Sequence, residues 1–332
     1  MIFKVKSVVC CVVFLFGCIV CARLIVYLGN FKINWTRHDD GPRRMNGGSG
    51  TFEITSTVDD FLYFHFGDGT SNDEHLTRYI RSQIARPSPL RPRALMADSS
   101  TVSRGTEIKD GQSASPPSWR KDYSQIGQSL LVDKLLGGRR NGFFVECGAA
   151  DGESYSNSLY FELERNWTGL LVEANPSYHR DLLTKNRRAY VLNACLSPTR
   201  RPGRVRFRPL GVFGGIIDRV NARRGPIIRF PERLEPDVTV GCFPLNAVLA
   251  ALGVEHVDYL SLDVEGVELN ILETVNWTRF SVDVLTVERP STEENRKRLR
   301  ELLVGSGRYE QVEFNSTQDF VFLRRQTKLG VS

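Results

Sequence analysis

From Tyr123 to Arg325, short apolar runs alternate with longer segments whose apolar residues recur at helical spacing. This alternation is typical of successive strand–helix units, which place parallel strands in one sheet with helices packed on its faces. The last two apolar runs follow each other directly across a polar turn at Asn315, and this predicts an antiparallel hairpin. The predicted class is therefore α/β, with a parallel sheet that ends in a hairpin, in a domain at 123–326.

The expected elements follow from the apolar periodicity and from the Gly, Pro and Asn residues between the runs. Helices are expected at 124–136, 155–165, 177–185, 245–252, 267–275 and 292–303, and strands at 142–147, 169–173, 189–194, 257–263, 282–288, 309–314 and 320–325. The arginine-rich stretch from Ser197 to Gly241 is expected to be irregular. It is interpreted either as a docking face for an acidic glycan or protein or as a solvated insertion.

Residues 8–28 form an apolar run that only Arg23 interrupts, and two lysines precede it. A helix of about 20 residues crosses the hydrocarbon core of a bilayer. The lysines predict a type II protein of the secretory pathway, with a cytosolic tail at 1–7, a single-pass transmembrane signal-anchor and a lumenal or extracellular C-terminal domain. Cleavage after Ala22, as in a signal peptide, is the alternative, and it also sends the remainder across the membrane.

Residues 29–122 are polar and rich in Gly, Ser and Pro, so they predict a flexible stem with too little apolar surface to fold. Two patches in it, Phe61–Phe66 and Glu74–Arg81, are interpreted as docking segments or a marginal helix. Residues 327–332 form a C-terminal tail. Sequons of the Asn-x-Ser/Thr type predict glycosylation beyond the anchor, and they lie at Asn34, Asn166, Asn276 and Asn315.

An acidic residue and a glycine-rich turn follow the first predicted strand of the domain, within Phe143–Glu153. Gly148 lets the backbone approach a bound nucleoside, Gly152 relieves the tight turn, and Glu146 can accept a hydrogen bond from a ligand. The next strand ends at Glu173, where an acidic residue can bind the two ribose hydroxyls of a nucleoside cofactor. The Gly-x-x-x-Gly spacing favours S-adenosylmethionine over a dinucleotide.

A second acidic group follows the strand expected at 257–263 and consists of Asp263, Glu265 and Glu268. In open α/β sheets, ligands bind beyond the carboxyl ends of the strands. These side chains are therefore expected to face the same crevice as the acidic residues of the first two strands. Each has a structural alternative, because a carboxylate at a helix start also caps the helix or binds loop amides.

On these residues the chain resembles the FkbM-type methyltransferase family, over about Ser124 to Arg325. Its Asp-x-Glu-Gly-x-Glu signature is matched by Asp263, Glu265, Gly266 and Glu268. Within the family, the chain is most similar to a membrane-anchored subgroup of animal proteins that resemble the insect protein Star, as judged from Gly127-Gln128, 142–149, 156–158, 167–173 and 195–197. The resemblance implies a class I, Rossmann-like S-adenosylmethionine-dependent methyltransferase fold.

The resemblance implies two alternative functions. One is an O-methyltransferase that transfers the methyl group of S-adenosylmethionine to a hydroxyl of a small molecule or glycan. In that case the cofactor is held by Glu146, Gly148, Gly152 and Glu173, and the methyl-transfer site is lined by Asp263, Glu265 and Glu268, of which Asp263 or Glu265 accepts the proton. The other is a non-enzymatic Star-like adaptor for vesicle transport of growth-factor-type membrane cargo from the endoplasmic reticulum through the Golgi to endosomes.

Three cysteines lie outside the apolar run, and at most one internal pair can form among them. Cys195 with Cys242 is the preferred pair, because Cys147 lies in the predicted cofactor turn. The net charge of +6 is too modest to indicate a nucleic-acid partner. No Cys/His set in the sequence has the spacing of a zinc site, and no metal is predicted.

Overall fold

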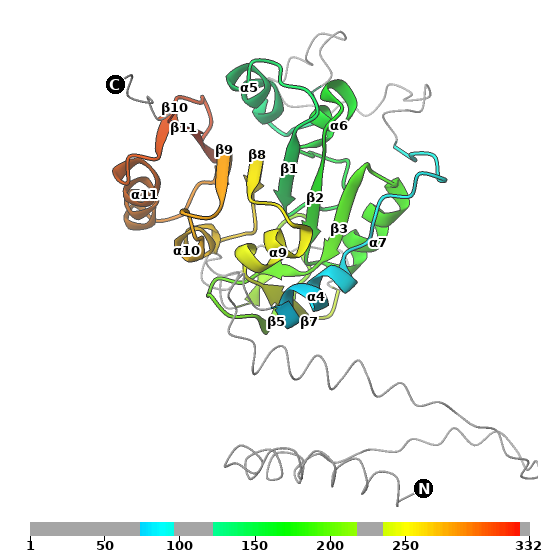
Figure 1. Cartoon of the computed structure of the whole chain (residues 1–332). Helices are drawn as coiled ribbons and strands as arrows, with labels where there is room; N and C mark the ends of the chain where they lie inside the picture. The colour runs from blue at the N-terminus through cyan, green and yellow to red at the C-terminus, as the bar shows by residue number, and fades with distance from the viewer. Residues whose placement is uncertain (1–73, 96–121, 218–234, 326–332) are drawn as a thin grey trace, which may run out of the picture. The chain divides into compact units, whose positions relative to one another are not determined.

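The computed structural model describes residues 74–95, 122–217 and 235–325, and these form an α/β domain of three layers (Figure 1). The larger sheet in the described residues has seven strands in the order β10-β11-β9-β8-β1-β2-β3. Its strands are β1 (Phe143–Cys147), β2 (Thr168–Glu173), β3 (Ala189–Asn193), β8 (His256–Leu262), β9 (Ser281–Glu288), β10 (Tyr309–Val312) and β11 (Asp319–Arg324). The strand expected at 142–147 is therefore an interior strand of the sheet, between β8 and β2.

Parallel pairing runs from β9 through β8, β1 and β2 to β3, as predicted from the alternation of strands and helices. β11 runs antiparallel to both β9 and β10, which confirms the predicted C-terminal hairpin. Because β1 has a parallel neighbour on each side, its carboxyl end lies between the ends of β2 and β8. Residues that follow these three strands are thereby brought to one edge of the sheet.

Helices cover both faces of this sheet. On one face the core includes side chains of α4 (Glu74–Gln83), α9 (Leu245–Leu252), α10 (Glu268–Thr274) and α11 (Glu293–Arg300), the last of which runs on into a π-helical turn at Glu301–Gly305. On the other face the core includes side chains of α5 (Gln128–Leu135), α6 (Leu159–Arg165) and α7 (Pro176–Lys185). Trp167, which is fully buried, anchors the second core against Phe161.

The prediction that 197–241 is irregular was wrong in part. A smaller sheet has the order β4-β7-β5-β6, and its strands are β4 (Cys195–Leu196), β5 (Gly203–Arg208), β6 (Gly215–Ile216) and β7 (Val238–Phe243). In β5, exposed arginines alternate with Val205 and Phe207, a period of two that the high charge conceals. β4 and β7 are joined by a disulfide between Cys195 and Cys242, which confirms the preferred pair.

The predicted stem includes a segment that is folded onto the domain. In α4, Leu76 and Ile80 are fully buried in the same core as α9, and Arg81 Nε donates to the carbonyl of Ala251 in α9 at 2.7 Å. Residues further along extend the sheet edge, because Ala85 exchanges two backbone hydrogen bonds with Val191 of β3. The marginal helix expected at Glu74–Arg81 is thus a helix of the domain, and the domain begins before residue 123.

Two helices begin later than predicted because the preceding backbone is left-handed. Gly127, with φ 95°, directly precedes α5, which was expected from residue 124. Tyr155, with φ 59°, was expected to open α6, which begins at Leu159. A residue with positive φ cannot continue an α-helix, so the intervening residues form turns instead.

In the three ranges that the structure describes, every helix is too short or too polar to cross a bilayer. The predicted cytosolic tail, the signal-anchor at 8–28, the patch at 61–66, Asn34 and the tail at 327–332 lie outside the described residues. The other three predicted glycosylation sites, Asn166, Asn276 and Asn315, are exposed.

Leu76→Ala tests whether α4 is part of the domain. We expect the free energy of unfolding of the full chain to fall by about 2–5 kcal/mol, because the side chain leaves a cavity in the core. Arg78→Ala, at an exposed position of the same helix, is expected to change it by less than about 0.5 kcal/mol. Urea denaturation followed by circular dichroism measures both, and equal effects of the two substitutions would contradict the placement of α4.

Candidate functional site

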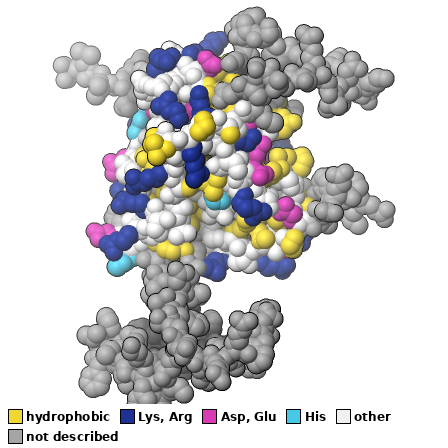
Figure 2. Space-filling view, turned by 90° about the vertical axis from the view of Figure 1, so that its right-hand side faces the viewer, with side chains coloured by type: hydrophobic (Ala, Val, Ile, Leu, Met, Phe, Trp, Pro, Cys, Tyr) yellow, Lys and Arg dark blue, Asp and Glu magenta, His cyan; other side chains and the backbone are white. Residues whose placement is uncertain are grey.

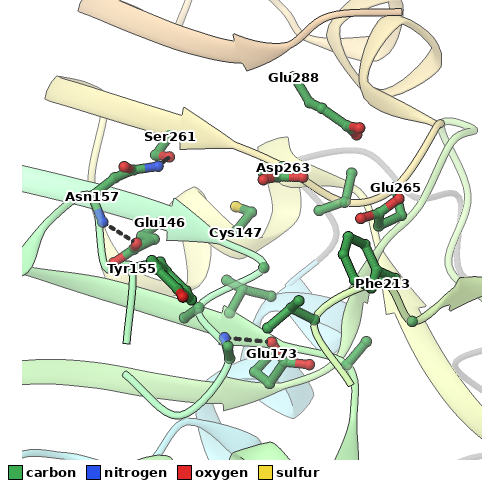
Figure 3. A pocket seen from close by; sticks show the side chains of 18 of the residues that line it. Glu146, Cys147, Tyr155, Asn157, Glu173, Phe213, Ser261, Asp263, Glu265 and Glu288 are labelled. Atoms are coloured by element: carbon green, nitrogen blue, oxygen red, sulfur yellow. Dashed lines mark hydrogen bonds between the residues drawn. The ribbon is translucent and has the colours of Figure 1, made fainter. Parts of the chain in front are cut away.

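A cavity of about 630 Å³ lies beyond the carboxyl ends of the central strands (Figure 3). Its walls come from the loop after β1, the ends of β2 and β9, the loop after β8 and the part of the smaller sheet between residues 207 and 216. The predicted site residues that line it are Glu146, Gly148, Glu173, Asp263 and Glu265. Gly152 and Glu268 lie outside the lining.

The loops after β1 and β8 touch backbone to backbone. Asp263 N donates to the carbonyl of Cys147 at 3.1 Å, which extends the pairing of the two strands by one bond. Gly148 has φ 84°, and a Cβ at this position would lie 1.9 Å from the carbonyl oxygen of Asp263. Only glycine fits, so the glycine turn and the second acidic group are held together at the floor of the cavity.

Gly152 is needed for packing of the turn against α7. A Cβ at Gly152, whose φ is 79°, would lie 2.1 Å from Cδ1 of Leu182 in α7. The glycine therefore allows the turn to pack against α7. Its predicted contact with a cofactor stays a prediction.

Glu173 ends β2 and points into the cavity. Its Oε2 accepts a hydrogen bond from Ala150 N at 2.8 Å, and its Oε1 accepts one from Asn175 N at 2.6 Å (Figure 3). Burial raises the pKa of Glu173 to about 7, although backbone N–H groups of residues 150, 174 and 175 oppose this rise. The carboxylate is thus held by the glycine turn on one side and by the start of α7 on the other.

Glu146 is the second-last residue of β1, and its carboxylate is hydrogen-bonded by the loop that precedes α6. Its carboxylate accepts hydrogen bonds from Ser156 Oγ at 2.9 Å, from Asn157 N at 2.6 Å and from the Ser158 hydroxyl. The side chain is only 3% exposed. These bonds fix the loop that forms one wall of the cavity, and the predicted contact of Glu146 with a cofactor stays a prediction.

The buried side chain of Glu268 holds the turn after β8 through hydrogen bonds to its backbone. Its Oε1 accepts hydrogen bonds from Val264 N at 3.1 Å and from Gly266 N at 2.8 Å. Burial raises the pKa of Glu268 to about 8, and the nearby Glu288, with which it forms a hydrogen bond, raises it further. The raised pKa favours the protonated carboxyl, in a position where it supports the turn and lies behind the lining of the cavity.

Asp263 and Glu265 present their side chains to the cavity from this turn. Glu265 adopts a left-handed conformation with φ 63°, which is uncommon for a residue other than glycine, and it lines the cavity. Asp263 lines the cavity and its surface is open to it, although protein atoms crowd around its carboxyl. Burial of its carboxyl among protein atoms raises its pKa well above the ordinary range, and repulsion by Glu288 and Glu265 adds to this effect. A carboxyl with a raised pKa is suited to accept a proton near neutral pH.

Two groups in the described residues have carboxylate or imidazole atoms close enough to share a metal ion. Ligand atoms of Asp263, Glu268 and Glu288 lie within 4.8 Å of one another, as do those of a second group at 256, 258 and 283. In the first group, the hydrogen bond between Glu268 and Glu288 accounts for the short spacing. In the second, Arg139 binds both carboxylates. Neither geometry requires a cation.

Several cavity residues were missed by the sequence reasoning. Tyr155 and Phe213 are 62% and 51% exposed and lie at the cavity, the second in the turn between β5 and β6. Asn157 donates to Ser261 Oγ at 2.9 Å, but its buried Oδ1 has no hydrogen-bond partner in the described part of the chain, and the same is true of Arg289 Nε. Asn157 lies in 156–158, one of the segments that carry the family resemblance, but the sequence gives it no role, because the loops around the cavity come together only in the fold.

The profile of the methyltransferase FkbM domain matches residues 146–321. The chain belongs to the FkbM methyltransferase-domain family. The family predicted from the Asp-x-Glu-Gly-x-Glu signature is therefore confirmed, and the mixed sheet is that of a methyltransferase-like domain. Family membership supports S-adenosylmethionine as the cofactor of the FkbM domain. No curated protein matches the chain significantly in sequence.

Solved structures resemble the FkbM domain only distantly. TrmK of M. capricolum, in complex with S-adenosyl-homocysteine, has a TM-score of 0.30 and 9% identity over 58% of this chain and 66% of that chain, just under two thirds of its length. Fibrillarin of Aeropyrum pernix, with bound S-adenosyl-L-methionine, has a TM-score of 0.30 and 14% identity over 59% of this chain and 73% of that chain. The family assignment rests on the profile match.

Substitutions at Glu268 test its role beneath the turn. The pKa of Glu268 is raised from 4.5 to about 8, so the folded state holds a proton that the unfolded state releases, and stability falls as pH rises from about 5 to 8. Glu268→Gln mimics the protonated acid, and we expect it to flatten this pH dependence. Glu268→Ala removes the acceptor of two N–H groups and is expected to cost roughly 1–3 kcal/mol at pH 6.

Thermal unfolding of the full chain between pH 5 and pH 8.5 measures both effects. Glu294→Gln is the matched control, because Glu294 is an exposed glutamate on α11. A Glu268→Gln variant with the pH slope of the wild type would contradict the protonated state of Glu268.

Proposed function

We propose that the FkbM domain binds S-adenosylmethionine in the cavity and methylates a hydroxyl group of a small molecule or glycan. The observation that carries this proposal is the convergence of the Gly148 turn, Glu173 and the pair Asp263 and Glu265 on one cavity. Its volume of about 630 Å³ is within the usual range of small-molecule sites, roughly 300–1,000 Å³. Residues that can bind a nucleoside and residues that can accept a proton thus line the same cavity.

The residues present fit this cofactor. A carboxylate offers about four acceptor positions, and backbone N–H groups of three residues use part of them at Glu173, which leaves capacity for a ribose hydroxyl. The unpaired Oδ1 of Asn157 adds a buried acceptor in the lining, suited to an ammonium group. The Gly148 turn allows close approach of a ligand to the backbone.

S-adenosylmethionine, when bound, supplies a methyl group on a positively charged sulfur. Transfer to a hydroxyl releases a proton, and Asp263 is the proposed acceptor because it lines the cavity and its carboxyl has a raised pKa. Glu265, on the same turn, orients the acceptor hydroxyl. Tyr155 and Phe213 provide apolar surface at the cavity for the body of the acceptor.

We further propose that the chain is a Star-like, single-pass type II membrane protein of the secretory pathway. The Cys195–Cys242 disulfide supports this location, because disulfides persist in oxidising compartments such as the endoplasmic reticulum and the cell exterior. The exposed sequons at Asn276 and Asn315 are available for glycosylation there.

The same disulfide favours a second candidate function. The methyl donor is expected to be scarce in the secretory lumen, and a domain located there can keep a methyltransferase fold as a binding scaffold. The second proposal is therefore a non-enzymatic adaptor for vesicle transport of growth-factor-type membrane cargo between the endoplasmic reticulum, the Golgi and endosomes.

Calorimetric titration of the full chain with S-adenosylmethionine separates the two functions. We expect micromolar binding at pH 8 that Glu173→Ala weakens by at least about tenfold, because a charge-assisted hydrogen bond to the ribose is lost. Since burial raises the pKa of Glu173 to about 7, wild-type affinity should also increase as pH rises from 6 to 8. Asp181→Ala, at an exposed carboxylate of α7, is the control. Absence of binding to well-folded protein would favour the adaptor.

For the enzymatic step, Asp263→Asn is the informative substitution. We expect it to leave the affinity for S-adenosylmethionine within about threefold of the wild type while methyl transfer to a hydroxyl acceptor falls by roughly 10²–10⁴-fold, the range of general-base effects. Transfer of a labelled methyl group to a panel of glycans measures this. Undiminished transfer by Asp263→Asn would exclude Asp263 as the proton acceptor.

A further inference from the structure

A second hollow lies away from the methyltransferase cavity, at the opposite edge of the sheet. It has a volume of about 860 Å³ and is lined by the start of β2, the residues after α7, the end of α6 and the segment at 87–93. Thr168, the first residue of β2, lies in it, whereas Glu173, the last residue of that strand, lines the methyltransferase cavity. We call this hollow the basic groove.

One wall of the basic groove is the segment at 87–93, which is held in place mainly through its backbone. Asn186, the left-handed residue that ends α7, donates from Nδ2 to the carbonyls of Ser88 and Arg91, at 3.1 and 2.5 Å, and accepts from Ser88 N at 3.1 Å. Ala94 N also donates to the carbonyl of Lys185 at 3.1 Å. The segment that carries Arg91 and Arg93 is therefore fixed against the domain by backbone contacts.

The charge of the basic groove is strongly positive. Five arginines and one carboxylate line it, and that carboxylate, Glu162, is buried and bound by the fully buried Arg187 at 2.6 Å. The other four arginines, at 91, 93, 140 and 188, are exposed. Figure 2, which views the side that carries α7, shows many Lys and Arg side chains spread over this face, with fewer acidic ones among them.

These four arginines have little negative charge to neutralise them. Arg93 lies 3.7 Å from Glu162, which Arg187 already neutralises. Arg140 donates to the carbonyl of Glu164, and Arg188 donates to Oδ1 of Asn166, so their polar contacts are to uncharged groups. In the described residues, no carboxylate forms a salt bridge with the arginines at 91, 140 and 188. Their charge is directed at solvent.

The lining indicates which kind of anion would bind. A guanidinium group presents paired N–H donors that match the oxygens of sulfate or phosphate. Single-stranded nucleic acids are usually held by aromatic side chains on which bases stack, and none lines the groove among the described residues. The hollow shape does not suit a flat lipid surface. A chain of sugars that carries sulfate groups fits a wide, polar groove of this charge.

We propose that the basic groove binds a sulfated polysaccharide. The site is independent of the proposed methyl transfer, because it uses other residues at the other edge of the sheet. Binding would place the domain on sulfated glycans of the secretory pathway or the cell surface, with the opening of the methyltransferase cavity left uncovered.

A heparin octasaccharide is the probe, and surface plasmon resonance with the full chain is the measurement. We expect salt-dependent binding that the triple variant Arg91→Ala, Arg140→Ala, Arg188→Ala weakens by at least about tenfold, with a shallower salt dependence. The triple variant Lys297→Ala, Arg308→Ala, Arg325→Ala removes the same charge from exposed positions on the α11 and β11 side and should change affinity by less than about twofold. The matching lysine triple variant at 91, 140 and 188 should be intermediate, because it keeps charge but loses paired donors.

Equal losses in the two alanine triple variants would overturn the proposal, because the effect would then come from net charge alone. Equal binding of an unsulfated chain of the same sugars would overturn it as well. Tighter binding of a single-stranded oligonucleotide, an acidic peptide or anionic vesicles, with loss in the 91, 140 and 188 variant, would assign the groove to a different partner. Circular dichroism of each variant confirms that a loss does not come from unfolding.

Discussion

The close contact between the ends of β1 and β8 is the constraint on which the site depends. Asp263 N bonds to the carbonyl of Cys147, and the Asp263 carbonyl occupies the space where any residue but glycine at 148 would place its Cβ. This contact brings two distant segments of the chain to the same point. It sets the floor of the cavity, and the remaining walls are built around it.

The acidic residues around this floor divide into two kinds. The carboxylates of Glu146 and Glu268 accept hydrogen bonds from loop amides and hydroxyls, so they determine where the loops lie. Glu173, Asp263 and Glu265 line the cavity, as Glu146 also does, and Glu173 is tied to the glycine turn by Ala150 N. A motif of identical residue types thus contains both structural supports and groups that are open to a ligand. The proposed chemistry uses the second kind.

The sequence predicts the strands of the larger sheet well, because most of them are short apolar runs that alternate with helical segments, and their order places the motifs at one edge. It does not reveal β5, whose alternating arginines conceal a period of two. It also underestimates α4, a polar ten-residue helix stabilised by two buried residues, Leu76 and Ile80, rather than by its own propensity. The partners of Glu146 and Glu268 could not be predicted, since they depend on how the loops close.

The most direct test of the central claim is a crystal structure of the full chain or of its folded part with S-adenosylhomocysteine. We expect the nucleoside in the cavity, with its ribose hydroxyls within hydrogen-bond distance of Glu173 and its sulfur directed toward Asp263. A nucleoside bound elsewhere, or in the cavity without a contact to Glu173, would contradict the assignment of this cavity as the cofactor site.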